Sequence, residues 1–170
     1  EIDSTNTELM RRARTGQSEP VLLVAERQTA GRGRLGRPWA SDVGASLTFS
    51  LGLPLAPADW SGLSLAVGVA LAESLHTDVR IKWPNDLWLS DGNGSGRKLG
   101  GVLIEAIAVG SQRVAVVGVG LNVMNQGHLP AIATVSEFAA DATPAGVLAE
   151  VGPALAQALR DFEAEGFAAF

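Results

Sequence analysis

The sequence predicts an α/β or α+β fold in which helices flank a mixed β-sheet. Two observations support this class: strand-like apolar segments gather in the middle of the chain, and helix-like segments occur at several other places. The 170 residues contain no convincing internal repeat and no low-complexity linker. At this length one domain is expected, and folding can bury about 70% of the surface of the unfolded chain. We therefore treat residues 1–170 as one domain.

The first part of the chain is expected to hold one helix and two strands. Residues 5–8 (TNTE) have the spacing of a capping box, and a helical pattern continues from them to Arg14. Apolar segments at 21–26 and 46–53 are typical of strands. The segment between them, residues 27–41, contains three glycines and a proline, which predicts an irregular loop.

Two further helices and four strands are expected in the rest of the chain. Apolar runs rich in Ala and Leu predict helices at 60–76 and at about 145–165. The turn residues Pro84-Asn85-Asp86 and the glycine-rich segment 91–96 predict connections between strands. The strands that these connections separate are expected at 79–83, 87–89, 99–108 and 113–119.

Composition excludes several classes of function. The lack of cysteine excludes a disulfide scaffold, an iron–sulfur cluster, a thiolate zinc site and a cysteine nucleophile. The two histidines, His76 and His128, lack ligand-like spacing, so no built-in metal site is predicted, whereas a divalent ion brought by a nucleotide is compatible with the sequence. A net charge of −5 argues against nucleic acid or a membrane surface as a general partner. No apolar run reaches the roughly 18 residues of a membrane span.

The segment from Arg27 to Ser41 differs from this acidic background, because it holds four arginines and no acidic residue. Arginine presents a planar fork of donors that suits carboxylate and phosphate oxygens, and the alternating glycines of residues 31–37 (GRGRLGR) allow the backbone to approach a ligand. A dinucleotide fingerprint is not predicted, because no strand leads directly into the first glycine and no helical pattern follows the third. We interpret this basic loop as an anion-binding loop, with a solvated surface loop as the alternative.

Three later segments are also candidates for chemistry. The turn in residues 81–86 (IKWPND) can hold an amide and a carboxylate at the end of the sheet, facing a ligand or a metal-bound nucleotide. Lys98, one of two lysines, precedes two glycines and can extend its ammonium over a site as a point charge. The glycines of residues 118–123 (GVGLNV) suggest close approach of backbone or ligand. Local turn hydrogen bonds, a solvated strand end and tight sheet packing are the respective structural alternatives.

Read in order, these segments resemble the biotin protein ligase family. The matching pieces are residues 3–6 (DSTN), 26–39 (ERQTAGRGRLGRPW), 82–86 (KWPND), 98–101 (KLGG) and 118–123 (GVGLNV). The resemblance implies a two-step reaction, in which biotin and ATP form biotinyl-5′-AMP and the biotinyl group then passes to a lysine of a biotin carboxyl carrier domain. That domain would belong to an acetyl-CoA carboxylase subunit, and Mg²⁺ would accompany ATP.

The same resemblance implies roles for individual residues. Lys98 and Arg32 are the catalytic candidates, and Lys98 would contact both the biotin carboxylate and the attacked phosphate. The implied biotin-binding residues are Ser4, Thr5, Asn6, Gln28, Gly31, Arg32, Gly33, Arg34 and Lys98. The implied ATP- and adenylate-binding residues are Arg34, Arg37, Trp39, Asn85, Asp86, Lys98 and Asn122, with Mg²⁺ near Asp86 and no metal built into the protein.

The resemblance also bears on extent, location and partners. Family members usually carry a small β-barrel after the catalytic domain, and some carry an N-terminal DNA-binding domain. We expect residues 1–170 to form the catalytic domain, with the barrel absent or unresolved and no DNA-binding domain. A cytoplasmic enzyme is expected, without nucleic-acid or membrane partners, and an exposed sheet edge could support a homodimer. The alternatives are a lipoate or octanoate ligase or transferase of similar fold and a non-catalytic anion-binding module.

Overall fold

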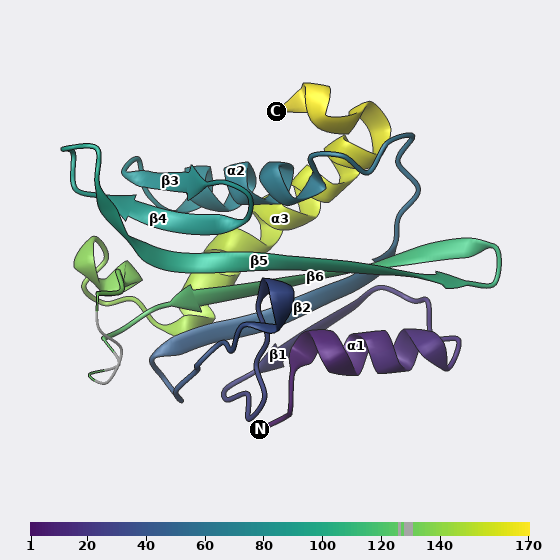
Figure 1. Cartoon of the computed structure of the whole chain (residues 1–170), viewed down its shortest axis with the longest axis horizontal. Helices are drawn as coiled ribbons and strands as arrows, with labels where there is room; N and C mark the ends of the chain where they lie inside the picture. The colour runs from purple at the N-terminus through teal and green to yellow at the C-terminus, as the bar shows by residue number, and fades with distance from the viewer. Residues whose placement is uncertain (126, 128–130) are drawn as a thin grey trace.

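The computed structural model describes residues 1–125, 127 and 131–170. His128, one of the two histidines considered as metal ligands, lies outside the described residues. Within the described residues, six strands form one sheet with helices on both faces (Figure 1). Helix α1 lies on one face, and helices α2 and α3 lie on the other. The predicted α/β class, a sheet flanked by helices, is confirmed.

The strands pair in the order β1-β2-β6-β5-β4-β3, and all pairings between them are antiparallel. Short hairpins connect β3 through β6, and a short hairpin can join only antiparallel neighbours. Parallel pairing, which a mixed sheet implies, is limited among the described residues to isolated bridges from Ile2 to Gln28 and from Lys98 to Ile132. The strands are β1 (Val21–Ala25), β2 (Ser46–Pro54), β3 (Val79–Lys82), β4 (Asp86–Ser90), β5 (Gly96–Val109) and β6 (Gln112–Asn122).

Helix α1 (Thr5–Arg14) begins one residue earlier than the capping-box spacing predicts. Its N-cap is Ser4, whose side chain accepts a hydrogen bond from the backbone N–H of Thr7. The hydroxyl of Thr5 does not cap the helix and instead donates to Gln28. The apolar side of α1 packs on the sheet through Leu9 and Met10, which form a small buried cluster with residues of β1, β5 and β6.

The main core lies between the opposite face of the sheet and helices α2 (Leu63–Leu75) and α3 (Pro144–Glu165). Phe49 from β2, Leu71 from α2 and Phe162 from α3 are fully buried there. Helix α2 is shorter than the predicted 60–76, because its N-cap is Gly62 in a left-handed conformation. Among the described residues, none of these helices combines the length and apolar character needed to cross a bilayer.

The described residues also form three short 3₁₀ turns: η1 (Arg34–Gly36), η2 (Val135–Glu137) and η3 (Gly166–Ala169). The first lies inside the basic loop, which was predicted to lack regular structure. This turn contains a left-handed Leu35 whose side chain is almost fully exposed. The η1 turn therefore places its one arginine, Arg34, on a bend of the chain without burying any of its own residues.

Candidate active site

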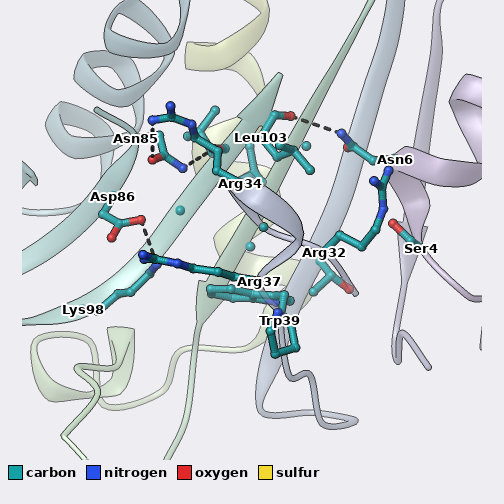
Figure 2. Close-up of a pocket in the computed structure, with 18 of the residues that line it drawn as sticks. Ser4, Asn6, Arg32, Arg34, Arg37, Trp39, Asn85, Asp86, Lys98 and Leu103 are labelled. Carbon is teal, nitrogen blue, oxygen red and sulfur yellow. Dashed lines mark hydrogen bonds and ion pairs between the residues drawn. The ribbon is translucent and has the colours of Figure 1, made fainter. Parts of the chain in front are cut away.

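A cavity of about 670 Å³ opens on the face of the sheet that carries α1. The N-terminus of α1, the basic loop, the turn between β3 and β4, and strands β2, β5 and β6 line it. Segments that are far apart in the sequence thus meet around one space (Figure 2). The lining includes these predicted site residues: Ser4, Thr5, Asn6, Gln28, Arg32, Gly33, Arg34, Arg37, Trp39, Asn85, Asp86 and Lys98.

Two predicted site residues, Gly31 and Asn122, do not line the cavity. The carbonyl of Gly31 accepts a hydrogen bond of 2.9 Å from the backbone N–H of Trp39, which closes the base of the basic loop. A Cβ atom at Gly31 would overlap the Trp39 carbonyl, so a glycine is required at this closure. Asn122 is buried and donates its amide to the backbone carbonyl of Lys98 at 3.3 Å. Both residues therefore stabilise segments that line the cavity without lining it themselves.

One end of the cavity is a buried polar network. The backbone N–H of Thr5 donates to Gln28 Oε1 at 2.7 Å. The hydroxyl of Ser50 lies 2.7 Å from Thr5 Oγ1 and 2.6 Å from Asn6 Oδ1. The Asn6 amide donates to the carbonyl of Leu103 at 3.2 Å, as Figure 2 shows. These bonds hold the first turn of α1 in one orientation at the cavity wall.

Two glycines of β6 make room for side chains of this site. A Cβ atom at Gly118 would overlap the carboxamide of Asn6, and one at Gly120 would overlap the indole ring of Trp39. Close approach to this strand is observed, but the groups that approach are side chains of α1 and of the basic loop, where the sequence predicted backbone or a ligand. Trp39 Nε1 is buried and has no hydrogen-bond partner among the described residues.

At the other end of the cavity, a β-bulge orients Lys98. Trp88 pairs with Lys98 and Leu87 pairs with Gly100, so β5 has one extra residue, Leu99, between these pairs. Leu99 is fully buried in the main core, and Lys98 lines the cavity on the opposite face. Bulges commonly re-aim a side chain in this way. The bulge therefore places Lys98 on the same face of β5 as Gly101 and Leu103, which also line the cavity.

The ammonium of Lys98 is held inside the cavity by one carboxylate. Lys98 Nζ lies 2.7 Å from Asp86 Oδ1 and 5.9 Å from the centroid of the Trp39 indole ring. The backbone carbonyl of Lys98 accepts from Ala133 N–H at 2.8 Å and from Asn122. The side chains of the ion pair are partly exposed, so solvent screens their attraction. An anionic ligand can therefore compete with Asp86 for the ammonium.

The basic loop contacts both sides of the cavity. Arg34 donates to Asn85 Oδ1 at 3.4 Å, and the amide of Asn85 donates to the carbonyl of Val102 at 2.8 Å. Arg32 donates to Glu105 Oε2 at 3.1 Å. In Figure 2 the side chains of Arg34 and Arg32 point away from the loop in opposite directions. The loop thus bridges the β3–β4 turn and strand β5.

Several lining residues were not predicted as site residues. Thr48, Phe49 and Leu103 lie inside strands and give no signal in the sequence. Lys82 and Trp83 belong to a motif that was recognised, yet no role was assigned to them. Additional unpredicted lining residues are Leu35, Pro38, Pro84, Trp88, Gly101, Val102, Gly118, Val119 and Gly120.

The cavity is strongly basic although the chain carries a net charge of −5. Asp86 is its one carboxylate among the described lining residues. Lys82 Nζ lies 3.6 Å from the centroid of the Trp88 ring, a cation–π contact. Local charge, rather than net charge, therefore makes this site suitable for anions. The basic side chains that line it are Arg32, Arg34, Arg37, Lys82 and Lys98.

The described residues contain no group of three or more His, Cys, Asp or Glu side chains that could hold a metal ion. One carboxylate, Asp86, is available at the basic end of the cavity. Mg²⁺ is commonly held by one or two carboxylates together with substrate phosphates. The residues present therefore fit a magnesium ion that is carried by a nucleotide.

Comparisons with known proteins agree with this geometry. The model of the biotin/lipoate A/B protein ligase family matches residues 1–122. The bifunctional ligase/repressor BirA of Escherichia coli is 38% identical over 185 residues, which cover 99% of this chain and 54% of BirA. The biotin–(acetyl-CoA-carboxylase) ligase of Mycobacterium tuberculosis is 40% identical over 131 residues, covering 71% of this chain and 46% of that protein.

The fold comparison leads to the same family. The structure of biotin protein ligase from Aquifex aeolicus in complex with biotin and ATP superposes with a TM-score of 0.76 at 30% identity, covering 98% of this chain and 70% of that one. The chain spans about half the length of the curated relatives named above. Because the family model covers residues 1–122, this chain belongs to the biotin/lipoate A/B protein ligase family.

Proposed function

We propose that the protein is an ATP-dependent biotin protein ligase. In the first step, a carboxylate oxygen of biotin attacks the α-phosphorus of ATP, which forms biotinyl-5′-AMP and releases pyrophosphate. In the second step, the amine of a carrier lysine attacks the acyl carbonyl and AMP leaves. The observation that carries this proposal is a single cavity with a buried polar network at one end and a cluster of cations at the other.

The polar end suits the ureido ring of biotin, which offers two N–H donors and one carbonyl acceptor. The side chains of Thr5, Asn6 and Gln28 present oxygens and amides there, and Ser50 holds two of them in place. The N-cap residue Ser4 also lines this end. A preorganised polar site of this kind favours a ligand that satisfies its hydrogen bonds, because unpaired buried groups are costly.

The basic end suits the reaction between two anions. A carboxylate must approach a polyphosphate, and local positive charge lowers the repulsion between them. Lys98 would exchange Asp86 for the biotin carboxylate and the α-phosphate, and Arg32, Arg34 and Arg37 would add to the field. Removing one preorganised donor of this kind costs about 3–4 kcal/mol in the transition state. Lys98 is therefore our main catalytic candidate.

The groups around Lys98 would serve the nucleotide. Trp39 would stack near the adenine, and Asn85 would contact the nucleotide after release from Arg34. Asn122 would act through the backbone of Lys98, whose carbonyl it holds. When Mg²⁺ is bound to the phosphates, it neutralises part of their charge, and Asp86 would be its ligand from the protein.

The second candidate is a lipoate or octanoate protein ligase, because the family model includes lipoate ligases. An octanoyl chain has no partners for the polar network around Thr5 and Asn6, which favours biotin. The test is to incubate the protein with ATP and, separately, biotin, lipoate or octanoate, and to identify the acyl adenylate by mass spectrometry. Adenylate formation from biotin alone supports the proposal, and formation from octanoate or lipoate alone contradicts it. Oligonucleotide binding without any adenylate would support an anion-binding module.

Partner, oligomer and location remain predictions of the same proposal. The acceptor would be a lysine on the biotin carboxyl carrier domain of acetyl-CoA carboxylase, and its labelling after adenylation tests this assignment. The exposed edge strand β1, with Leu22 and Val24 about half exposed, supports the predicted homodimer. Sedimentation analysis would test the dimer, and fractionation would test the cytoplasmic location.

A further inference from the structure

Glu105 lies where helix α1, the basic loop and strand β5 meet. Its carboxylate accepts a hydrogen bond of 3.1 Å from the amide of Asn6 and forms an ion pair of 3.1 Å with Arg32. Arg32 also donates to Thr7 Oγ1 at 3.2 Å. The side chain of Glu105 is 28% exposed and does not line the cavity. One carboxylate therefore joins a residue of the polar network to an arginine of the loop.

The basic loop has few other attachments. No residue from Arg32 to Ala40 is buried, so the loop contributes no side chain to the core. Among the described residues, the side-chain hydrogen bonds from 32–37 to other parts of the molecule come from Arg32 and Arg34. Segments with few buried apolar contacts open locally at low free-energy cost. Apart from Trp39, whose indole ring packs on Gly120 at the base of the loop, the state of the loop therefore depends on these two arginines.

The two attachments differ in strength. Arg34 donates to the neutral amide oxygen of Asn85 at 3.4 Å, near the limit of a hydrogen bond. Arg32 contacts a carboxylate at the shorter distance of 3.1 Å. The Arg34 bond has one ionised partner, whereas the Arg32 contact joins two opposite charges and so adds a Coulomb attraction. Glu105 also neutralises the charge of Arg32 and so reduces the repulsion among the loop arginines. The contact between Glu105 and Arg32 is therefore the stronger of the two attachments.

We propose that Glu105 is a positioning residue that holds the basic loop closed over the cavity and so sets how long the activated intermediate stays bound. The proposal deepens the proposed function and rests on it, because the retained intermediate is biotinyl-5′-AMP. A closed loop excludes water from this mixed anhydride, which water would otherwise hydrolyse. By holding Asn6 as well, Glu105 couples loop closure to the orientation of the polar network.

The first test needs no ligand and no activity. Trypsin cleaves after arginine, so its rate of cutting within residues 32–37 reports opening of the loop. We expect Glu105→Gln to accelerate this cleavage about three- to five-fold, the effect of losing one partly exposed ion pair. Gln keeps an acceptor for Asn6, so thermal unfolding should change little. The matched control is Arg12→Ala, which removes the 2.8 Å pair with Glu8 on α1, away from the cavity.

The second test measures release of biotinyl-5′-AMP by the full-length protein. We expect Glu105→Gln to raise the dissociation rate by a similar factor, while the rate of adenylate formation at saturating substrate stays within two-fold. In an Arg32→Ala background, adding Glu105→Gln should change loop cleavage no further, because the pair is already broken. Additive effects of the two substitutions would overturn the proposal that Glu105 holds the loop through Arg32.

The outcomes separate this proposal from the proposed function. If Glu105→Gln leaves both loop cleavage and adenylate release at the wild-type rate, Glu105 does not hold the loop, whatever reaction the protein catalyses. If the wild-type protein forms no biotinyl-5′-AMP, the proposed function fails and the retention role fails with it. Faster cleavage in Glu105→Gln would then still show that the ion pair with Arg32 keeps the loop closed.

Discussion

The ammonium of Lys98 and the carboxylate of Asp86 lie 2.7 Å apart, on adjacent strands β5 and β4. The pair is partly exposed, so it contributes little to the stability of the fold. The pair matters because of its position, since both side chains line the basic end of the cavity. In the absence of a ligand, Asp86 keeps the ammonium directed into the space where two anions would react.

Lys98→Ala should abolish adenylate formation and leave the fold intact. Loss of one preorganised cation at the reacting phosphate is expected to lower the rate by about 10²–10³-fold. The measurement is release of pyrophosphate in the presence of biotin and ATP, with circular dichroism as the check on folding. Near-normal pyrophosphate release from a folded variant would rule out this role for Lys98.

Arg34→Gly should let the adenylate leave the site before transfer. The variant loses the contact with Asn85 that holds one side of the basic loop. The bond to Asn85 is long and exposed, but Arg34 would also contact the adenylate. Loss of a hydrogen bond to a charged phosphate costs about 1.5–3 kcal/mol, so release of the adenylate should accelerate by roughly ten-fold or more. The readout is biotinylation of a bystander protein in the reaction mixture.

The matched control for Arg34 is Arg27→Gly. Arg27 belongs to the same loop but pairs with Glu1 at 3.4 Å and does not line the cavity. This variant should label the bystander no more than the wild type does. If labelling by Arg34→Gly stays confined to the carrier domain, Arg34 does not retain the adenylate and the prediction is wrong.

Gly118→Ala should destabilise the protein and weaken biotin binding together. A Cβ atom at this position would overlap the carboxamide of Asn6, so α1 must shift. Overpacking of this kind costs about 1–3 kcal/mol in the free energy of unfolding. Gly152→Ala is the control for binding, because it lies in α3 away from the cavity and, apart from its chain neighbours and its own helix backbone, no atom lies within 4 Å of the new methyl group, so biotin affinity should not change. Unfolding in urea and calorimetry with biotin measure the two effects, and unchanged biotin affinity in Gly118→Ala would contradict the prediction.

The ion pair of Arg97 and Glu137 should make stability depend on pH. Hydrogen bonds from Arg97 lower the pKa of Glu137 below its ordinary value of about 4.5, and the backbone N–H of Thr134 adds to this shift. A lowered pKa stabilises the folded state above pH 4.5, and this stabilisation is lost as pH falls through the lowered value. The difference in free energy of unfolding between wild type and Glu137→Gln should therefore shrink as pH falls below 4.5.

Urea unfolding between pH 7 and pH 3 measures this difference. Asp3 and Glu8 also have lowered pKa values because of neighbouring hydrogen bonds, so only the difference from the wild type isolates Glu137. Glu165→Gln at the exposed end of α3 is the control and should shift the curve little. A difference that is constant with pH would show that Glu137 does not act through its charge.

Much of the site could be predicted from local sequence because its chemistry is carried by short motifs. The arginines and glycines of the basic loop, the Asn85-Asp86 turn and the isolated Lys98 are unusual residues in their local context. All of these segments contribute to one cavity. Their contact could not be predicted from spacing, since the partners Asn6 and Leu103 are 97 residues apart and meet through the pairing of six strands.

The supporting residues escaped prediction for a physical reason. Ser50 and Glu105 lie within strands whose residue types are ordinary, and their importance comes from partners on other elements. Ser50 is fully buried and contacts the first turn of α1, whereas Glu105 joins that turn to the basic loop. Hydrogen-bond partners of this kind depend on the register of strand pairing, because a one-residue slip would move each side chain to the other face of the sheet.

The sequence by itself determined the class of fold, most of the helices and strands, and the kinds of groups that could bind two anions. Only the tertiary structure decided which side of the sheet each group faces. Regular alternation along β5 would put Lys98 on the face opposite Gly101 and Leu103, and the extra residue Leu99 restores it to the cavity face. Because side chains alternate with a period of two, this single bulge places the candidate catalytic ammonium in the cavity.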